Sequence, residues 1–184
     1  MSTQQAATGL GAKAPGFDLP GIDGARHSLA SSRGPNGLLV MFICNHCPYV
    51  KAARSRILRD CSELAGEGIG SIAIMSNDPE DYPEDSFENM KKVAAQFRYP
   101  FPYAFDETQD VARVFGAQCT PYFFGYNGAL ELQYRGRLDA SSRVEPAAGA
   151  PRELFDAMVQ IARTGRGPVN QTPSIGCSIK WKRS

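Results

Sequence analysis

The hydrophobic positions along the chain follow two kinds of pattern. Unbroken apolar runs at 37–43 and 69–75 have the length and bulk of strands that are buried on both faces of a sheet. Apolar residues spaced three and four positions apart indicate amphipathic helices instead. The helices that this spacing predicts are 49–65, 86–98, 108–115 and 151–164.

Turn signals add two hairpins to these elements. Asp23-Gly24 and Asn127-Gly128 are the dipeptides that tight hairpin turns favour. The strands that they join are predicted at 14–21 with 26–29, and at 122–126 with 130–135. The order hairpin, strand, helix, strand, helix, helix, hairpin, helix predicts an α/β fold with three layers, in which helices cover both faces of a mixed sheet.

The two ends of the chain differ from each other. Residues 1–14 are polar and small, and we expect a loose arm there. The tail, residues 165–184, is rich in Gly, Pro and polar residues, yet it carries Ile175, Cys177 and Trp181. Because a disordered tail rarely holds such residues, we expect it to pack on the body of one domain that spans 1–184.

Composition excludes several classes of protein. Hydrophobic residues make up 42% and charged residues 21% of the 184 positions, which is typical of a globular domain. The net charge of +1 argues against nucleic-acid and membrane-surface partners, since both require a basic excess. The N-terminus shows no secretory pattern, so we expect a reducing cytoplasm. Clustered cysteines there are more often catalytic or metal-binding than structural.

Cys44 and Cys47 form a C-x-x-C motif between a predicted buried strand and a predicted helix. A helix N-terminus stabilises a thiolate, and a thiolate is the species that attacks disulfides and peroxides. The second cysteine is near enough to form a disulfide and to release what the first has attacked. His46, if protonated, would lower the thiol pKa further. These three residues are therefore catalytic candidates.

A second signal is Cys119-Thr120-Pro121, immediately before a predicted strand. A proline in that place is a candidate for the cis form, and cis prolines shape sites. Cys119 would then lie near the C-x-x-C motif, either as a third redox thiol or merely as a loop residue. Cys61, on the apolar helix face, is interpreted as a core thiol.

Together these segments resemble the peroxiredoxin-like branch of the thioredoxin family, in the superfamily of alkyl hydroperoxide reductase and thiol-specific antioxidant. The resemblance covers nearly the whole chain. The matching segments are Ala14-Pro15-Gly16-Phe17-Asp18-Leu19-Pro20-Gly21, Phe42-Ile43-Cys44-Asn45-His46-Cys47-Pro48-Tyr49-Val50-Lys51, 76–87, 106–109, Cys119-Thr120-Pro121, 134–139 and Pro173-Ser174-Ile175-Gly176-Cys177-Ser178-Ile179-Lys180-Trp181.

The resemblance implies a thioredoxin-like fold in which the loop carrying Thr120 and a cis Pro121 faces the C-x-x-C motif. It implies thiol–disulfide exchange without a bound cofactor or metal, with Cys44 as the attacking and Cys47 as the resolving thiol. Substrates would be protein or small-molecule disulfides, or peroxides, and electrons would come from a thioredoxin- or glutathione-type donor. Cys177, in the tail motif, would either resolve an oxidised site cysteine or be a packed tail thiol.

The peroxidase alternative requires a Pro and a Thr ahead of the reactive cysteine. Aligned on Cys47, those positions hold Val40 and Cys44, which favours disulfide exchange. Pro48 points the other way, because a proline often follows a peroxidatic cysteine. Proline also favours the first helical position, which would place Cys47 at the helix cap.

Two further alternatives remain open. Cys44, Cys47, Cys119 and His46 offer soft ligands suited to Zn or Cu(I). The chain could also be an interaction module with a vestigial site. The acidic segment 77–85 is expected to be a solvated loop that caps the helix beginning at Ser86.

Overall fold

The computed structural model describes residues 9–184, and its centre is a mixed sheet of five strands. The strand order is β5 (Tyr103–Phe105), β4 (Ile69–Met75), β3 (Gly37–Phe42), β7 (Tyr122–Asn127) and β8 (Leu132–Gly136). β4 and β5 are parallel, whereas β3 with β7 and β7 with β8 are antiparallel. β3 and β4 lie side by side, and the Ile43 N–H donates to the Ile74 carbonyl at 3.1 Å.

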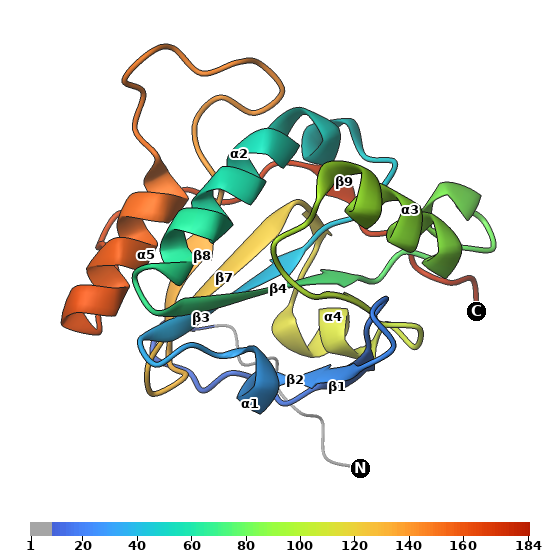
Figure 1. The fold of residues 1–184 in the computed structure, drawn as a ribbon, viewed down its shortest axis with the longest axis horizontal. Coiled ribbons are helices and arrows are strands. Elements are labelled where there is room, and N and C mark those ends of the chain that lie inside the picture. Colours follow the sequence, from blue (N-terminus) through green and yellow to red (C-terminus); the bar gives the residue numbers. More distant parts are fainter. Residues whose placement is uncertain (1–8) are drawn as a thin grey trace.

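Helices cover both faces of this sheet (Figure 1). On one face lie α2 (Pro48–Ala65), α3 (Phe87–Phe97) and α5 (Glu153–Thr164). On the other lie α1 (Leu29–Ser32), α4 (Asp110–Phe115) and the hairpin of β1 (Asp18–Pro20) with β2 (Arg26–Ser28). The predicted three-layer α/β architecture and the N-terminal hairpin are confirmed.

Strand β3 shows why its hydrophobic run is unbroken. Leu39 and Met41 pack into the core under α2, whereas Leu38 and Val40 pack into the core on the α4 side. Successive side chains of a strand point to opposite faces, so a strand between two helical layers needs apolar residues at every position. No helix within the described part of the chain is long and apolar enough to cross a membrane.

Strand β5 was not predicted from the sequence. It has only three residues, and prolines at 100 and 102 precede it. It nevertheless pairs in parallel with β4, with Ala73, Ile74 and Met75 facing Tyr103, Ala104 and Phe105. The sheet therefore has one edge strand more than the hydrophobic pattern indicates.

The prediction of a loose arm over 1–14 fails for its last residues. Residues 1–8 lie outside the described residues, but the Gly11 N–H donates to Leu132 O at 2.7 Å and the Leu132 N–H donates to Ala12 O at 2.8 Å. The backbones of Lys13 and Glu131 form an isolated antiparallel β-bridge. Residues 11–13 are thus held against β8, and the prediction of a loose segment is wrong for them.

The tail packs on the body, as predicted. Its strand β9 (Cys177–Ser178) pairs antiparallel with the short strand β6 (Cys119–Thr120). The prediction of a solvated acidic loop at 77–85 is confirmed for residues 80–84, which are exposed, but is wrong for Asp78 and Asp85, which are buried. Residues Pro83–Asp85 form a 3-10 helix directly before Ser86, whose hydroxyl caps α3 by accepting from the Asn89 N–H.

Candidate functional site

The C-x-x-C motif lies where β3 ends and α2 begins. Cys47 is the N-cap residue of α2, and Pro48 is its first helical residue. Proline suits that place because its missing N–H would have no partner inside the helix. The side chains of Cys44 and Cys47 are both fully buried. The local sequence therefore places one cysteine at the start of the helix and the other on the loop that leads into it.

The loop between β6 and β7 faces these two cysteines. The peptide bond between Thr120 and Pro121 is cis. The Thr120 hydroxyl lies 3.4 Å from the Cys44 sulfur, and the Thr120 carbonyl oxygen lies 3.4 Å from the Cys47 sulfur. Thr120 therefore contacts both cysteines, through its side chain and through its main chain.

The tail brings a third thiol to the site. Thr120 pairs with Cys177 in the β6–β9 ladder, and the Cys177 sulfur lies 2.7 Å from the Cys47 sulfur. Cys119 lies on the same short strand, but the hydrogen bond found for its sulfur is a long one of 4.0 Å to the Pro121 carbonyl. Of the two additional candidate cysteines, Cys177 is the one that contacts the C-x-x-C motif.

Hydrogen bonding shifts the pKa values of the two cysteines of the motif in opposite directions. The pKa of Cys47 falls to about 4, chiefly because the Cys44 thiol donates to its sulfur; Cys177, the Val50 N–H and Thr120 add to this, and burial opposes it. The pKa of Cys44 rises far above its usual value because its proton is held between the sulfurs, and burial and the charge of Asp85 act in the same direction. The thiolate of this pair therefore belongs to Cys47.

The other thiols are protonated at neutral pH. Burial is the main cause that raises the pKa of Cys177 to about 11 and that of Cys119 also to about 11. Burial likewise raises the pKa of Cys61 to about 12, since this thiol lies in the core under α2, as the sequence predicted. Cys177 reaches the site as a neutral thiol next to the Cys47 thiolate.

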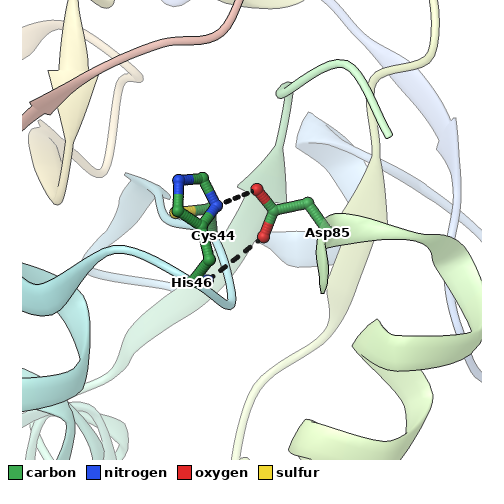
Figure 2. Close-up of side chains that lie close together, drawn as sticks. All are labelled: Cys44, His46 and Asp85. Atoms are coloured by element: carbon green, nitrogen blue, oxygen red, sulfur yellow. Dashed lines mark hydrogen bonds and ion pairs between the residues drawn. The ribbon is translucent and has the colours of Figure 1, made fainter. Parts of the chain in front are cut away.

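Asp85 organises the loop between the two cysteines, and no signal in the sequence pointed to it. Its side chain is 0% exposed. One carboxylate oxygen accepts from the backbone N–H groups of Asn45 and His46 at 2.7 and 3.3 Å, and the other accepts from the Asn77 amide at 2.9 Å. That second oxygen also lies 2.5 Å from His46 Nδ1 (Figure 2). Asp85 therefore fixes the loop conformation and the orientation of the His46 ring.

His46 contributes differently from the expectation. Its ring faces Asp85 and stacks on Tyr82, with a centroid separation of 5.2 Å. The groups that lower the pKa of Cys47 are thiols, Thr120 and a backbone N–H rather than this imidazole. His46 is close to Cys44 instead, and Figure 2 shows the Cys44 sulfur behind the His46 ring.

The residues with metal-ligand chemistry form a different set from the one predicted. Ligand atoms of Cys44, His46 and Asp85 lie within 4.8 Å of one another. Both oxygens of Asp85 already accept hydrogen bonds, from Asn45, His46 and Asn77. A cation would have to replace N–H donors that hold the loop, so the geometry fits a hydrogen-bonded carboxylate better than a metal ligand.

A small cavity of about 70 Å³ adjoins the cis proline. Its lining combines apolar side chains with charged ones, namely Tyr49, Pro121, Phe123, Leu138 and Ile175 with Arg56, Arg137 and Asp139. The cavity has room for a small apolar group next to the site. This cavity beside Pro121 is therefore a candidate binding place for part of a substrate.

Comparison with solved structures supports the architecture. An uncharacterised conserved protein from Geobacillus kaustophilus is 45% identical, with a TM-score of 0.88 over 96% of this chain and 94% of that one. A hypothetical protein from Sinorhizobium meliloti 1021 is 35% identical, with a TM-score of 0.87 over 96% of both chains. A putative thioredoxin from Neisseria meningitidis, at 22% identity and a TM-score of 0.63, covers 82% of this chain and 90% of its own. This likeness shows a thioredoxin-like fold.

Family comparison extends the result from fold to chemistry. The search of curated proteins found no match. The AhpC/TSA family model matches residues 10–141, which is more than half of the chain and includes both cysteines of the C-x-x-C motif. The match and the thioredoxin-like fold together support a thiol-based redox function. The chain belongs to the AhpC/TSA family.

Proposed function

We propose that the protein is a thiol–disulfide oxidoreductase in which Cys47 attacks and Cys44 resolves. The observation that carries this proposal is the position of Cys47. Cys47 is the N-cap residue of α2, its sulfur receives the Cys44 proton in a hydrogen bond, and its pKa falls to about 4. The resemblance implies the opposite order, with Cys44 attacking, but the electrostatics of the site favour Cys47.

In the first step the Cys47 thiolate attacks one sulfur of a substrate disulfide. A bond forms between Cys47 and that sulfur, the substrate disulfide breaks, and the other substrate sulfur leaves as a thiolate that takes up a proton. Cys47 is fully buried beneath the tail, so a substrate reaches it only where the tail or the loop at Thr120 gives way.

In the second step Cys44 resolves the mixed disulfide. The Cys44 thiol loses its proton, attacks the Cys47 sulfur and forms the Cys44–Cys47 disulfide, while the substrate sulfur leaves as a thiolate. A buried thiol beside a carboxylate needs a proton acceptor for this step. The His46–Asp85 pair lies within 4.8 Å of the Cys44 sulfur and supplies that acceptor.

The proposal includes the partners that this chemistry requires. The substrate is a protein or small-molecule disulfide, and a thioredoxin- or glutathione-type thiol returns the electrons. A cytoplasmic location would keep the dithiol reduced. The near-neutral charge of +1 favours neither nucleic acid nor a membrane surface as a partner.

A trapping experiment tests the order of attack. The reduced double variant Cys44→Ser/Cys177→Ser should react once with a disulfide-bearing peptide and hold it on Cys47, as intact-mass and peptide analysis would reveal. The matched double variant Cys47→Ser/Cys177→Ser should not form the adduct. An adduct on Cys44 in this variant, with none in Cys44→Ser/Cys177→Ser, would restore Cys44 as the attacking thiol.

A thiol-dependent peroxidase is the second candidate, because the chain belongs to the AhpC/TSA family and Pro48 follows a thiolate cysteine. Cys47 would attack the peroxide O–O bond to give a sulfenic acid and an alcohol, and a second thiol would then form a disulfide with release of water. Val40 and Cys44 stand where that mechanism requires Pro and Thr. Rapid peroxide consumption that survives Cys44→Ser and is lost in Cys47→Ser would favour the peroxidase.

A further inference from the structure

The part of the tail from residue 172 to residue 182, here named the strap, is fixed on both sides of Cys177. On one side the Arg137 N–H donates to Thr172 O at 3.0 Å, and the Ser174 hydroxyl donates to Gly136 O at 2.6 Å. On the other side the Lys180 N–H donates to the side chain of Asn77 at 2.8 Å. Cys177 is therefore held in place across the site by anchors on either side.

Close main-chain packing brings the strap against the cis-proline loop. Gly176 has no side chain, and a Cβ at this position would lie 2.0 Å from the Thr120 carbonyl oxygen. The absence of a Cβ lets Cys177 pair with Thr120 in the β6–β9 ladder. As a result the Cys177 sulfur lies 2.7 Å from the Cys47 sulfur.

The two sulfurs of this pair differ in access. Cys47 is fully buried, whereas Cys177 is partly exposed. A reagent in solution therefore meets Cys177 before it meets Cys47. The strap places a thiol of its own where the Cys47 sulfur would otherwise face an incoming substrate.

We propose that Cys177 is a third redox thiol, which forms a disulfide with Cys47 and through which reducing equivalents enter the site. This inference rests on the proposed role of Cys47 as the attacking thiolate. As a second route beside direct resolution by Cys44, the Cys177 thiol loses its proton and attacks Cys47 once Cys47 holds a substrate sulfur, and the substrate sulfur leaves as a thiolate. Exchange with Cys44 then gives the Cys44–Cys47 disulfide and returns Cys177 as a thiol.

Reduction of the Cys47–Cys177 disulfide has a preferred direction. A reductant thiolate attacks the accessible Cys177 sulfur, a new disulfide forms between them, and Cys47 leaves as a thiolate. A thiol of lower pKa leaves faster, and Cys47 has the lower pKa of the two. A second reductant thiol then releases Cys177, so that two thiols are oxidised for each disulfide reduced.

Tryptic mapping separates the two disulfides. Cleavage after Arg33 and Lys51 gives the peptide 34–51, which contains both Cys44 and Cys47, whereas Cys177 lies in the peptide 167–180. A Cys44–Cys47 disulfide therefore stays within one peptide, and a Cys47–Cys177 disulfide joins two. The reduced protein would be oxidised stepwise with glutathione disulfide, blocked with iodoacetamide and digested.

Linked peptides 34–51 and 167–180 should appear in the wild type and accumulate in Cys44→Ser. Their absence from Cys44→Ser after full oxidation would overturn the inference. The proposed function fails independently, if Cys177→Ser does not form the disulfide within 34–51. Brief treatment of oxidised Cys44→Ser with glutathione should place the adduct on 167–180, and an adduct on 34–51 would contradict entry through Cys177.

Gly176→Ala tests whether the strap positions the thiol. The added Cβ would displace the strap from Thr120, and we expect formation of the linked peptides to slow by about tenfold or more. Gly16→Ala is the matched control, because a Cβ at Gly16 meets no atom within 4 Å. An unchanged rate in Gly176→Ala would show that the pairing with Thr120 does not position Cys177.

Discussion

The start of α2 and its later turns each hold a buried cysteine, and the pKa values of these two thiols shift in opposite directions. Cys47 and Cys61 are 0% and 5% exposed. The pKa of Cys47 falls to about 4, whereas the pKa of Cys61 rises to about 12. Similar burial on the same helix therefore produces a thiolate at one end and an inert thiol further along.

Hydrogen-bond donors account for this difference. The sulfur of Cys47 at the helix start is approached by the thiols of Cys44 and Cys177 and by the Val50 N–H. For Cys61, burial among apolar side chains outweighs the hydrogen bond from the Ser71 side chain, and the charge of Asp60 opposes ionisation further. Burial penalises both thiolates, so the number of donors decides which one forms.

Removal of the attacking sulfur should have the largest effect. Cys47→Ser is expected to lower the rate of insulin disulfide reduction by about 10³-fold or more, because no other thiol at the site ionises readily. Cys61→Ala, on the same helix, should keep the rate and lose about 1–2 kcal/mol of unfolding free energy through the core cavity. Substantial activity in Cys47→Ser would remove the basis of the comparison.

Asp85→Asn should have the next largest effect. The amide preserves the shape of the side chain but places an N–H₂ group against the donors of His46 or Asn77. Because the site is fully buried, we expect a loss of about 2–4 kcal/mol in the free energy of unfolding measured with urea. Asp81→Asn, at a partly exposed carboxylate of the same acidic segment that pairs with Arg183, is the matched control and should cost less than about 1 kcal/mol.

The sequence predicted what depends on local pattern. The run 37–43, the helix at 49–65 and the C-x-x-C motif between them follow from neighbours in the chain, and the structure places them nearly as expected. Asp85 could not be distinguished, because five acidic residues stand close together in 78–85 and only the fold decides that Asp78 and Asp85 are the buried ones.

Contacts between distant segments could not be predicted either. Cys47 and Cys177 are 130 positions apart, and their contact depends on a two-residue ladder that no periodicity reveals. Strand β5 was missed for a related reason, since its three residues are set by pairing with β4 and not by their own pattern. The sequence therefore named the thiols of the site but not their geometry.

The pH dependence of attack by Cys47 should have the sign expected for a thiol whose pKa is lowered, in contrast to Cys61. Because the pKa of Cys47 is lowered to about 4, the thiolate forms as the pH rises through that value, and attack should be constant at neutral pH and fall below about pH 4. Cys44→Ala removes the hydrogen bond that lowers the pKa of Cys47 most, so this pKa should rise in the variant. The ultraviolet absorbance of the thiolate, corrected with Cys47→Ser, measures the titration of Cys47 in the wild type and in Cys44→Ala without requiring access to the buried sulfur. If Cys47 titrates at the same pH in Cys44→Ala as in the wild type, its lowered pKa would be due to its place at the start of α2 and not to Cys44.

Cys119→Ser should have the smallest effect, and it tests whether access or ionisation governs reactivity. Cys119 is more accessible than Cys47, yet burial and the nearby charge of Cys47 raise its pKa to about 11. If ionisation governs, the rate of insulin disulfide reduction in Cys119→Ser should stay within about twofold of wild type, because almost none of this thiol is ionised at neutral pH. Iodoacetamide should correspondingly label Cys119 slowly in spite of its exposure. Rapid labelling of Cys119, together with a marked loss of activity in Cys119→Ser, would show that the donors around Cys47 are not what sets it apart.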